Sequence, residues 1–208
     1  RGLVGSEMCI RDSLRYVKKP HQNDGGLKML NGNIGKCVAK ISAVKEQFRY
    51  IKAKTLVFDD QEEVKKAYEK GKLNRNVIIV VRNQGPKANG MPELHSLTPM
   101  LSNVQDLGFK VALLTDGRMS GASGKILAAI HVTPEAIDNG VIGKIEDDDE
   151  IEIDANNGKL NILTDISKRK NSLLNDMKKN QSFGRNIFNT LRIHSQGSEE
   201  GGGIKLID

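Results

Sequence analysis

The stretch VIIVVRNQGPKANGMPE, residues 77–93, decides the fold class. Its first five residues are uninterrupted and aliphatic, as expected of a strand that is buried on both faces of a sheet. Glycines and prolines follow soon after, so a loop leaves the carboxyl end of that strand. Residues 110–125, KVALLTDGRMSGASGK, repeat the arrangement. Two buried strands that each lead into a glycine-rich loop are typical of the parallel part of an α/β sheet.

Helical periodicity alternates with these strands. A short β-prone run over residues 55–58 precedes Asp60, which we expect to cap a helix that ends at Gly71. Apolar residues recur at three- and four-residue steps over residues 94–107, which predicts a helix or a pair of helices. Strands that alternate with helices indicate an α/β domain.

The second half of the chain predicts a short helix, a strand and a hairpin. Residues 133–140 begin with a threonine cap and a proline at the first helical position, and end in Asn-Gly, so a short helix is expected there. A strand should follow at residues 141–145. Residues 150–154 and 159–163 alternate apolar and polar side chains around Asn157-Gly158, which is a strong hairpin signal. Antiparallel hairpin strands make the expected sheet mixed.

The ends of the chain differ from its middle in composition. Residues 1–12 match nothing that follows, and GLVGSEMCIRDS resembles translated sequencing-adapter readthrough, so we expect them to be non-native. Residues 13–31 are polar and lack periodicity, which predicts a linker from a missing N-terminal domain. Residues 32–166 form the expected domain. Residues 167–208 are expected to be a basic helical extension, with a loose tail at 195–203.

Composition excludes several function classes. The net charge is +6, but the basic residues are dispersed and aromatic residues make up only 4%, so we expect no nucleic-acid partner. No apolar run approaches the roughly 20 residues that cross a bilayer, so no membrane span is expected. Two cysteines without metal-site spacing indicate a reducing compartment, here the cytoplasm. A small anionic substrate accounts for the charge equally well.

The first loop, residues 84–93, surrounds one lysine and one carboxylate with glycines and prolines. Glycines allow a close backbone approach to a ligand, and prolines restrict the path of the loop. Glu93 either caps the following helix or binds a metal. His95 is either structural or a substrate contact. Spacing alone leaves both alternatives open.

The second loop, residues 115–125, has three glycines, three hydroxyl side chains, an arginine and a lysine. Successive backbone N–H groups in such a loop form an anion-binding concavity, to which Arg118 or Lys125 would add charge. A Walker A loop is disfavoured because Met119 stands where its first glycine should be, and Ile126 follows the lysine. The loop is therefore either a ligand-free structural turn or an anion site.

Together, QGPKANGMPELH, TDGRMSGASGK and AAIHVTPEA closely resemble the C-terminal domain of the dihydroxy-acid dehydratase and phosphogluconate dehydratase family. The resemblance runs from Asn31 to about Leu163 and is weaker in FGRNIF and GSEEGG. The loop PKANGMPELH is similar to the phosphogluconate branch. The family implies a swivelling β/β/α-type domain, with a mixed, barrel-like sheet and flanking helices. It also implies a hydro-lyase that converts 6-phosphogluconate into 2-dehydro-3-deoxy-6-phosphogluconate in the Entner–Doudoroff pathway.

The same resemblance implies site residues and cofactors. Glu93 corresponds to a metal ligand, with Mg²⁺ expected, and Ser120 corresponds to the catalytic base that takes the C2 proton. Lys87, Arg118, Lys125 and His95 are the expected substrate-binding residues. An iron–sulfur cluster, 4Fe–4S by expectation, would have its ligands in the missing N-terminal domain. The fragment alone should be inactive, and the complete enzyme is expected to be a homodimer.

Two alternatives remain open at this point. The same scaffold could dehydrate another aldonic or 2,3-dihydroxy acid. The chain could also be a non-catalytic anion-binding module.

Overall fold

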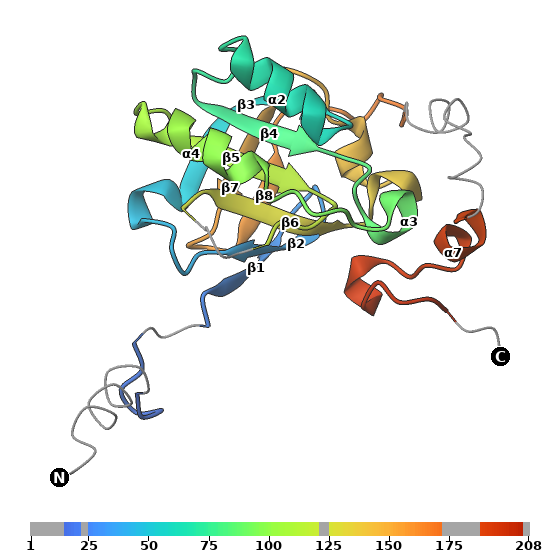
Figure 1. Cartoon of the computed structure of the whole chain (residues 1–208), viewed down its shortest axis with the longest axis horizontal. Helices are drawn as coiled ribbons and strands as arrows, with labels where there is room; N and C mark the ends of the chain where they lie inside the picture. Colours follow the sequence, from blue (N-terminus) through green and yellow to red (C-terminus); the bar gives the residue numbers. More distant parts are fainter. Residues whose placement is uncertain (1–14, 22–24, 121–124, 172–187, 206–208) are drawn as a thin grey trace.

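A computed structural model shows a closed barrel with helices on its outer face (Figure 1). It describes residues 15–21, 25–120, 125–171 and 188–205. Around the barrel the strands follow the order β1-β2-β6-β5-β4-β3-β7-β8. The expected α/β class and the mixed, barrel-like sheet are therefore confirmed.

Four neighbouring strands form the parallel part of the barrel. They are β3 (Tyr50–Phe58), β4 (Val77–Val81), β5 (Val111–Thr115) and β6 (Leu127–Thr133). Every residue of β4 and β5 is buried. Both faces of these strands are covered, which explains their uninterrupted aliphatic sequences.

Four antiparallel-paired strands complete the barrel: β1 (Leu27–Asn31), β2 (Lys36–Lys40), β7 (Glu150–Asp154) and β8 (Lys159–Ile162). The predicted hairpin is β7 and β8, and Gly158 adopts the left-handed φ of +69° that its turn requires.

The barrel closes where β1 meets β8 in a parallel register, with Asn31 opposite Lys159. Asn33 extends this seam through its side chain. Its Nδ2 donates to the Ile162 carbonyl at 2.8 Å, and its Oδ1 accepts from the Ile162 N–H at 2.8 Å. Gly32 lies against the same strand, because a Cβ there would be 1.9 Å from the Leu160 carbonyl oxygen.

Helices α2 (Gln61–Glu69) and α4 (Leu97–Asp106) cover the outer face of the parallel strands (Figure 1). Asp60 caps α2 as predicted, with its carboxylate accepting the Glu62 N–H at 2.8 Å. The two helices and the outward side chains of the strands form one apolar cluster, and the inward side chains form a second cluster inside the barrel. Shorter helices include α3 (Pro86–Asn89), α7 (Asn189–Ile193) and η1 (Glu46–Phe48).

The structure corrects several boundaries. Strand β1 lies within the predicted linker 13–31, so the barrel begins before residue 32. The chain from 141 to 144 is a 3-10 helix, η4 (Val141–Lys144), rather than a strand. The Gly143 N–H donates to the Gly140 carbonyl at 3.0 Å, a local bond between residues three apart that is typical of a 3-10 turn.

The predicted helix at 133–140 is a single 3-10 turn, η3 (Ala136–Asp138). Its cap position is Glu135, and the Thr133–Pro134 peptide is cis, so the predicted threonine cap was wrong. Asn139 ends the turn with a φ of +61°, as expected.

The tail 195–203 is not loose. It contains η5 (Ser198–Glu200), and Glu199 pairs with Lys36 of β2 at 2.7 Å. Most of the predicted basic helix, residues 172–187, lies outside the described residues, as do residues 1–12.

Candidate functional site

Both glycine-rich loops begin at the same edge of the barrel. Strands β4 and β5 are parallel neighbours, with Val81 opposite Thr115 at their carboxyl ends. The loops that follow them therefore start side by side. This edge of a parallel sheet is where α/β proteins commonly bind ligands.

Glu93 and Ser120 are in direct contact across the two loops. The Glu93 Oε1 atom accepts the Ser120 N–H at 2.6 Å and the His95 N–H at 3.1 Å. A β-bridge joins Glu93 to Arg118, whose Nε lies 3.8 Å from Oε2. The structure thus brings together four residues that the sequence singled out, with Ser120, Arg118 and His95 exposed.

Glu93 does not cap α4. That helix begins at Leu97 with Ser96 at its cap position, so Glu93 precedes it. The capping alternative for this carboxylate is excluded by that geometry. Its Oε1 atom is occupied by two backbone donors, whereas Oε2 faces the Arg118 side chain.

Lys87 and Lys125 have other surroundings. Lys87 lies on α3, and its Nζ pairs with the Asp138 carboxylate at 2.7 Å, a bond that raises the lysine pKa. Lys125 is exposed, and its carbonyl accepts from the Gln105 amide at 3.4 Å. Residues 121–124, which join it to Ser120, lie outside the described residues.

Asp116 is a buried acid that the sequence analysis did not predict as part of the site. Its side chain is fully buried directly after β5, and it accepts three backbone N–H groups: from Gln84 at 2.8 Å, from Asn83 at 3.1 Å and from Ala136 at 3.1 Å. Burial raises the pKa of this carboxyl, and the backbone donors oppose that shift. Its position at the carboxyl end of a buried run is the signal that could have found it.

Glu135 is a second buried acid that we did not predict. Its Oε2 accepts the Lys87 N–H at 3.2 Å at the start of α3, and its buried Oε1 has no hydrogen-bond partner. The pKa of Glu135 is raised to about 7. Burial is the largest cause, and the nearby negative charges of Asp116 and Asp138 add to it.

The described residues offer a divalent cation one carboxylate oxygen here, Oε2 of Glu93. No cluster of three or more His, Cys, Asp or Glu side chains suited to a metal occurs in the described parts of the chain. An iron–sulfur cluster does not fit Cys37, which is buried in the barrel interior, where burial raises its pKa to about 12. Cys9 lies outside the described residues.

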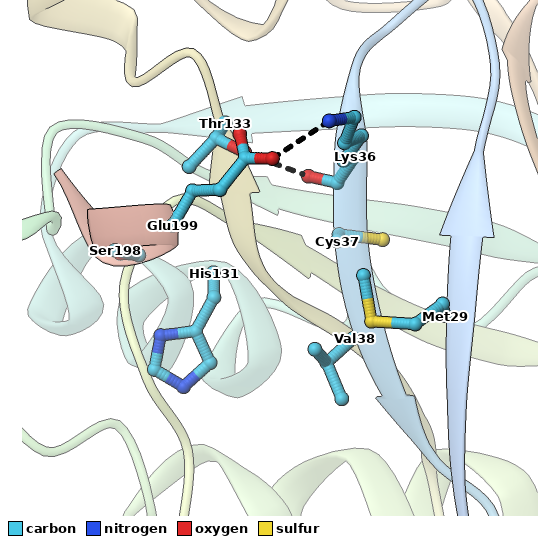
Figure 2. Close-up of a pocket in the computed structure, with 8 residues that line it drawn as sticks. All are labelled: Met29, Lys36, Cys37, Val38, His131, Thr133, Ser198 and Glu199. Carbon is cyan, nitrogen blue, oxygen red and sulfur yellow. Dashed lines mark hydrogen bonds and ion pairs between the residues drawn. The ribbon is translucent and has the colours of Figure 1, made fainter. Parts of the chain in front are cut away.

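A pocket of about 230 Å³ adjoins the second loop on the outer face of the barrel (Figure 2). His131 lines it and donates its backbone N–H to the Gly117 carbonyl at 2.9 Å. The pKa of His131 is lowered mainly by burial and to a smaller extent by the positive charge of Arg118. The ordered tail forms the opposite wall, where the Glu199 carboxylate bonds Lys36 and Thr133. The lining residues are Met29, Lys36, Cys37, Val38, His131, Thr133, Ser198 and Glu199.

A family model described as dihydroxy-acid/6-phosphogluconate dehydratase C-terminal matches residues 12–202. The chain belongs to this dehydratase family. The predicted resemblance is confirmed, and the match includes both β1 and the ordered tail.

Curated relatives in the family are similar over most of the chain. A phosphogluconate dehydratase of Helicobacter pylori strain J99 is 48% identical over 205 residues, which are 94% of this chain and 34% of that protein. One from Rhizobium meliloti is 51% identical over 194 residues, 92% of this chain and 32% of the relative. One from Zymomonas mobilis is 55% identical over 150 residues, which are 72% of this chain and 25% of the relative. The chain spans about a third of the length of the first of these dehydratases.

No helix in the described part of this dehydratase domain is long and apolar enough to cross a membrane.

Proposed function

We propose that the complete protein is a hydro-lyase that converts 6-phosphogluconate into 2-dehydro-3-deoxy-6-phosphogluconate in the Entner–Doudoroff pathway. The observation that carries this proposal is the 2.6 Å bond between the Ser120 N–H and the Glu93 carboxylate. It places the proposed base next to the proposed metal ligand, in a chain whose relatives are named phosphogluconate dehydratases.

Ser120 is the proposed base for the C2 proton. The proton passes to Oγ, the C2–H electron pair forms the C2=C3 bond, and the C3 hydroxyl leaves as water with a proton taken from solvent, to which Oγ later returns the C2 proton. The resulting enol becomes the 2-keto product. Each unit by which the serine pKa is lowered requires about 1.4 kcal/mol of preferential stabilisation of the alkoxide. Arg118, two residues away and exposed, supplies positive charge on this loop.

Glu93 would hold a divalent metal, Mg²⁺ in our proposal, through Oε2. When bound, the metal would orient the carboxylate end of the substrate and stabilise negative charge developing there. An iron–sulfur cluster belongs to the proposal only through the part of the protein outside this chain, and we derive no step from it.

Four residues are proposed to bind the substrate: Lys87, Arg118, Lys125 and His95. Arg118 is the best placed, because it is bridged to Glu93 and precedes Ser120 by two residues. Lys87 would have to exchange its Asp138 partner for a substrate oxygen. We also propose that this domain works together with an N-terminal part of the same protein, that the complete protein is a homodimer, and that it is located in the cytoplasm.

Replacement of Ser120 tests the proposed base. In the complete protein, Ser120→Ala should lower kcat by at least about 10²-fold, the lower range for removing a general acid–base group. Visible absorbance of the cofactor should stay unchanged. Ser96→Ala, at another exposed serine, serves as the matched control. Turnover of the Ser120 variant at the control rate would refute the role.

Substrate comparison tests the phosphorylated acid. The complete protein should turn over 6-phosphogluconate with a higher kcat/KM than gluconate. Equal values would favour the alternative, a dehydratase for another aldonic or 2,3-dihydroxy acid. Absence of turnover on any such acid would favour a non-catalytic module.

A further inference from the structure

Two buried acids beneath the loops have no part in the proposed chemistry. Asp116 is 0% exposed and Glu135 is 1% exposed, and both lie at the edge of the barrel where the loops begin. Buried carboxyl groups are costly unless hydrogen bonds or protonation offset the loss of water. The hydrogen bonds of the two carboxyl groups show which segments of the chain they connect.

Asp116 joins three segments of chain. Its Oδ1 and Oδ2 atoms accept the N–H groups of Gln84 and Asn83 in the first loop, and Oδ2 also accepts that of Ala136 after β6. Asp116 itself belongs to the second loop, four residues before Ser120. One side chain thus fixes the start of the Glu93 loop relative to the start of the Ser120 loop.

Close backbone packing makes this connection rigid. A Cβ on Gly117 would lie 2.5 Å from Cβ of Gln84, so the two loops touch without room for another atom. Asn83 has a φ of +62°, a strained conformation for a residue other than glycine, and its N–H is one of the groups that Asp116 accepts.

Glu135 supports the next part of the first loop. Its Oε2 atom accepts the Lys87 N–H, and a Cβ on Gly85 would lie 2.1 Å from that oxygen. The other oxygen, Oε1, is buried without a partner. Leaving a neutral carboxyl oxygen unpaired costs less than leaving a charged one unpaired, so this arrangement suits a protonated Glu135.

The charges that face the pair agree with a single shared negative charge. Asp116 receives three N–H donors, which favour its ionised form and oppose the effect of burial on its pKa. Glu135 faces Asp116 and Asp138, whose charges disfavour its ionisation, while the Lys87 ammonium is already paired with Asp138.

We propose that Asp116 and Glu135 are positioning residues, a buried acid pair carrying one negative charge that holds the Glu93 and Ser120 loops in their active arrangement. The catalytic consequence rests on the proposed function of Ser120 and Glu93. The structural claim does not, because hydrogen exchange can measure it without activity.

The first test follows amide exchange in the complete protein by mass spectrometry. Asp116→Asn replaces one accepting oxygen with a donor, so exchange of the 83–84 and 136 amides should accelerate by about fivefold, the effect of losing roughly 1 kcal/mol per bond. The amides of β4 should exchange as before. Asp106→Asn, at an exposed aspartate on α4, is the matched control. Unchanged exchange at 83–84 in the Asp116 variant would overturn the proposal.

The second test uses Glu135→Gln, which keeps the shape of the neutral acid and is the milder variant if Asp116→Asn fails to fold. Its kcat for 6-phosphogluconate below pH 7 should stay within about threefold of the parent. Above pH 7 the parent should lose kcat as Glu135 ionises beside Asp116 and Asp138, with KM little changed, whereas the glutamine variant should not.

Glu135→Ala, which removes the acceptor of the Lys87 N–H, should lose kcat by about tenfold or more at every pH, since small displacements of reacting groups are costly. An alkaline loss of kcat shared equally by the parent and the glutamine variant would refute the charge assignment. If the complete protein turns over no sugar acid, the exchange test still decides the positioning role.

Discussion

Gly117 shows at the scale of one residue why the second loop contains glycine. The nearest atom to a Cβ at this position would be Cβ of Gln84, at 2.5 Å, and the Gln84 carbonyl oxygen would follow at 2.9 Å. The backbone does not require glycine for its φ there. The requirement comes from the close approach of the two loops.

Gly117→Ala should therefore destabilise the chain by about 1–3 kcal/mol, the usual cost of overpacking a buried site. Gly25→Ala is its control, because a Cβ at Gly25 would meet nothing within 4 Å. Urea denaturation of both variants measures the difference. Equal midpoints would show that the loops separate at little cost.

Glu135 makes the stability of the fold depend on pH. Its pKa is raised from 4.5 to about 7 in the folded chain, so the folded state keeps a proton that the unfolded state loses. Its contribution therefore becomes less favourable as pH rises from about 4.5 to about 7, and it is constant above that range. Thermal denaturation across this window should show a smaller decline for Glu135→Gln than for the parent.

At the scale of the element, the aliphatic strands and the capped helix were predictable because each depends on local sequence. Strands β4 and β5 are continuous runs of buried side chains, and α2 begins at a capping aspartate. Strand β1 was missed because LKMLN has no clear alternation, and its strand character depends on pairing with β2. A strand was predicted for residues 141–145, but residues 141–144 form η4, in which the Gly143 N–H donates to the Gly140 carbonyl instead of to a neighbouring strand.

Asp60 gives a prediction at this scale. Asp60→Ala removes the acceptor of the Glu62 N–H and should lower the free energy of unfolding by about 1 kcal/mol. Asp60→Asn keeps a cap acceptor and should cost less. Circular dichroism during urea denaturation compares the two, and equal losses would mean that the carboxylate charge matters more than the hydrogen bond.

The site was predictable to a similar extent. Glu93, Ser120 and Arg118 were singled out from loop composition and family resemblance, and the structure brings the three residues together, while their roles stay predictions. Asp116 and Glu135 were not found, because each is one acid in an ordinary sequence setting. Their importance comes from backbone groups that lie 20 to 48 residues away in the chain.

For the whole molecule, closure of the barrel depends on the seam between β1 and β8. Asn33 donates to and accepts from Ile162 as a strand backbone would, so one side chain continues the ladder that closes the barrel. Asn33→Ala should cost about 1–3 kcal/mol, since it leaves two backbone groups of Ile162 without their partner. Asn156→Ala, at an exposed asparagine of the hairpin turn, is the control. Faster amide exchange in β8 for the first variant alone would support this account, and equal exchange in both would contradict it.

The bond between Glu93 and the Ser120 amide also bears on how this centre can change over evolution or in design. Because the Glu93 carboxylate of one loop accepts the Ser120 N–H of the other, the two segments depend on each other and have to be inherited together. An insertion in either loop would displace both proposed functional groups, whereas the exposed residues of α4, which lies between the two loops in the chain, can vary as long as the contact re-forms. Transplanting the centre into another scaffold would therefore require moving both segments together with Asp116.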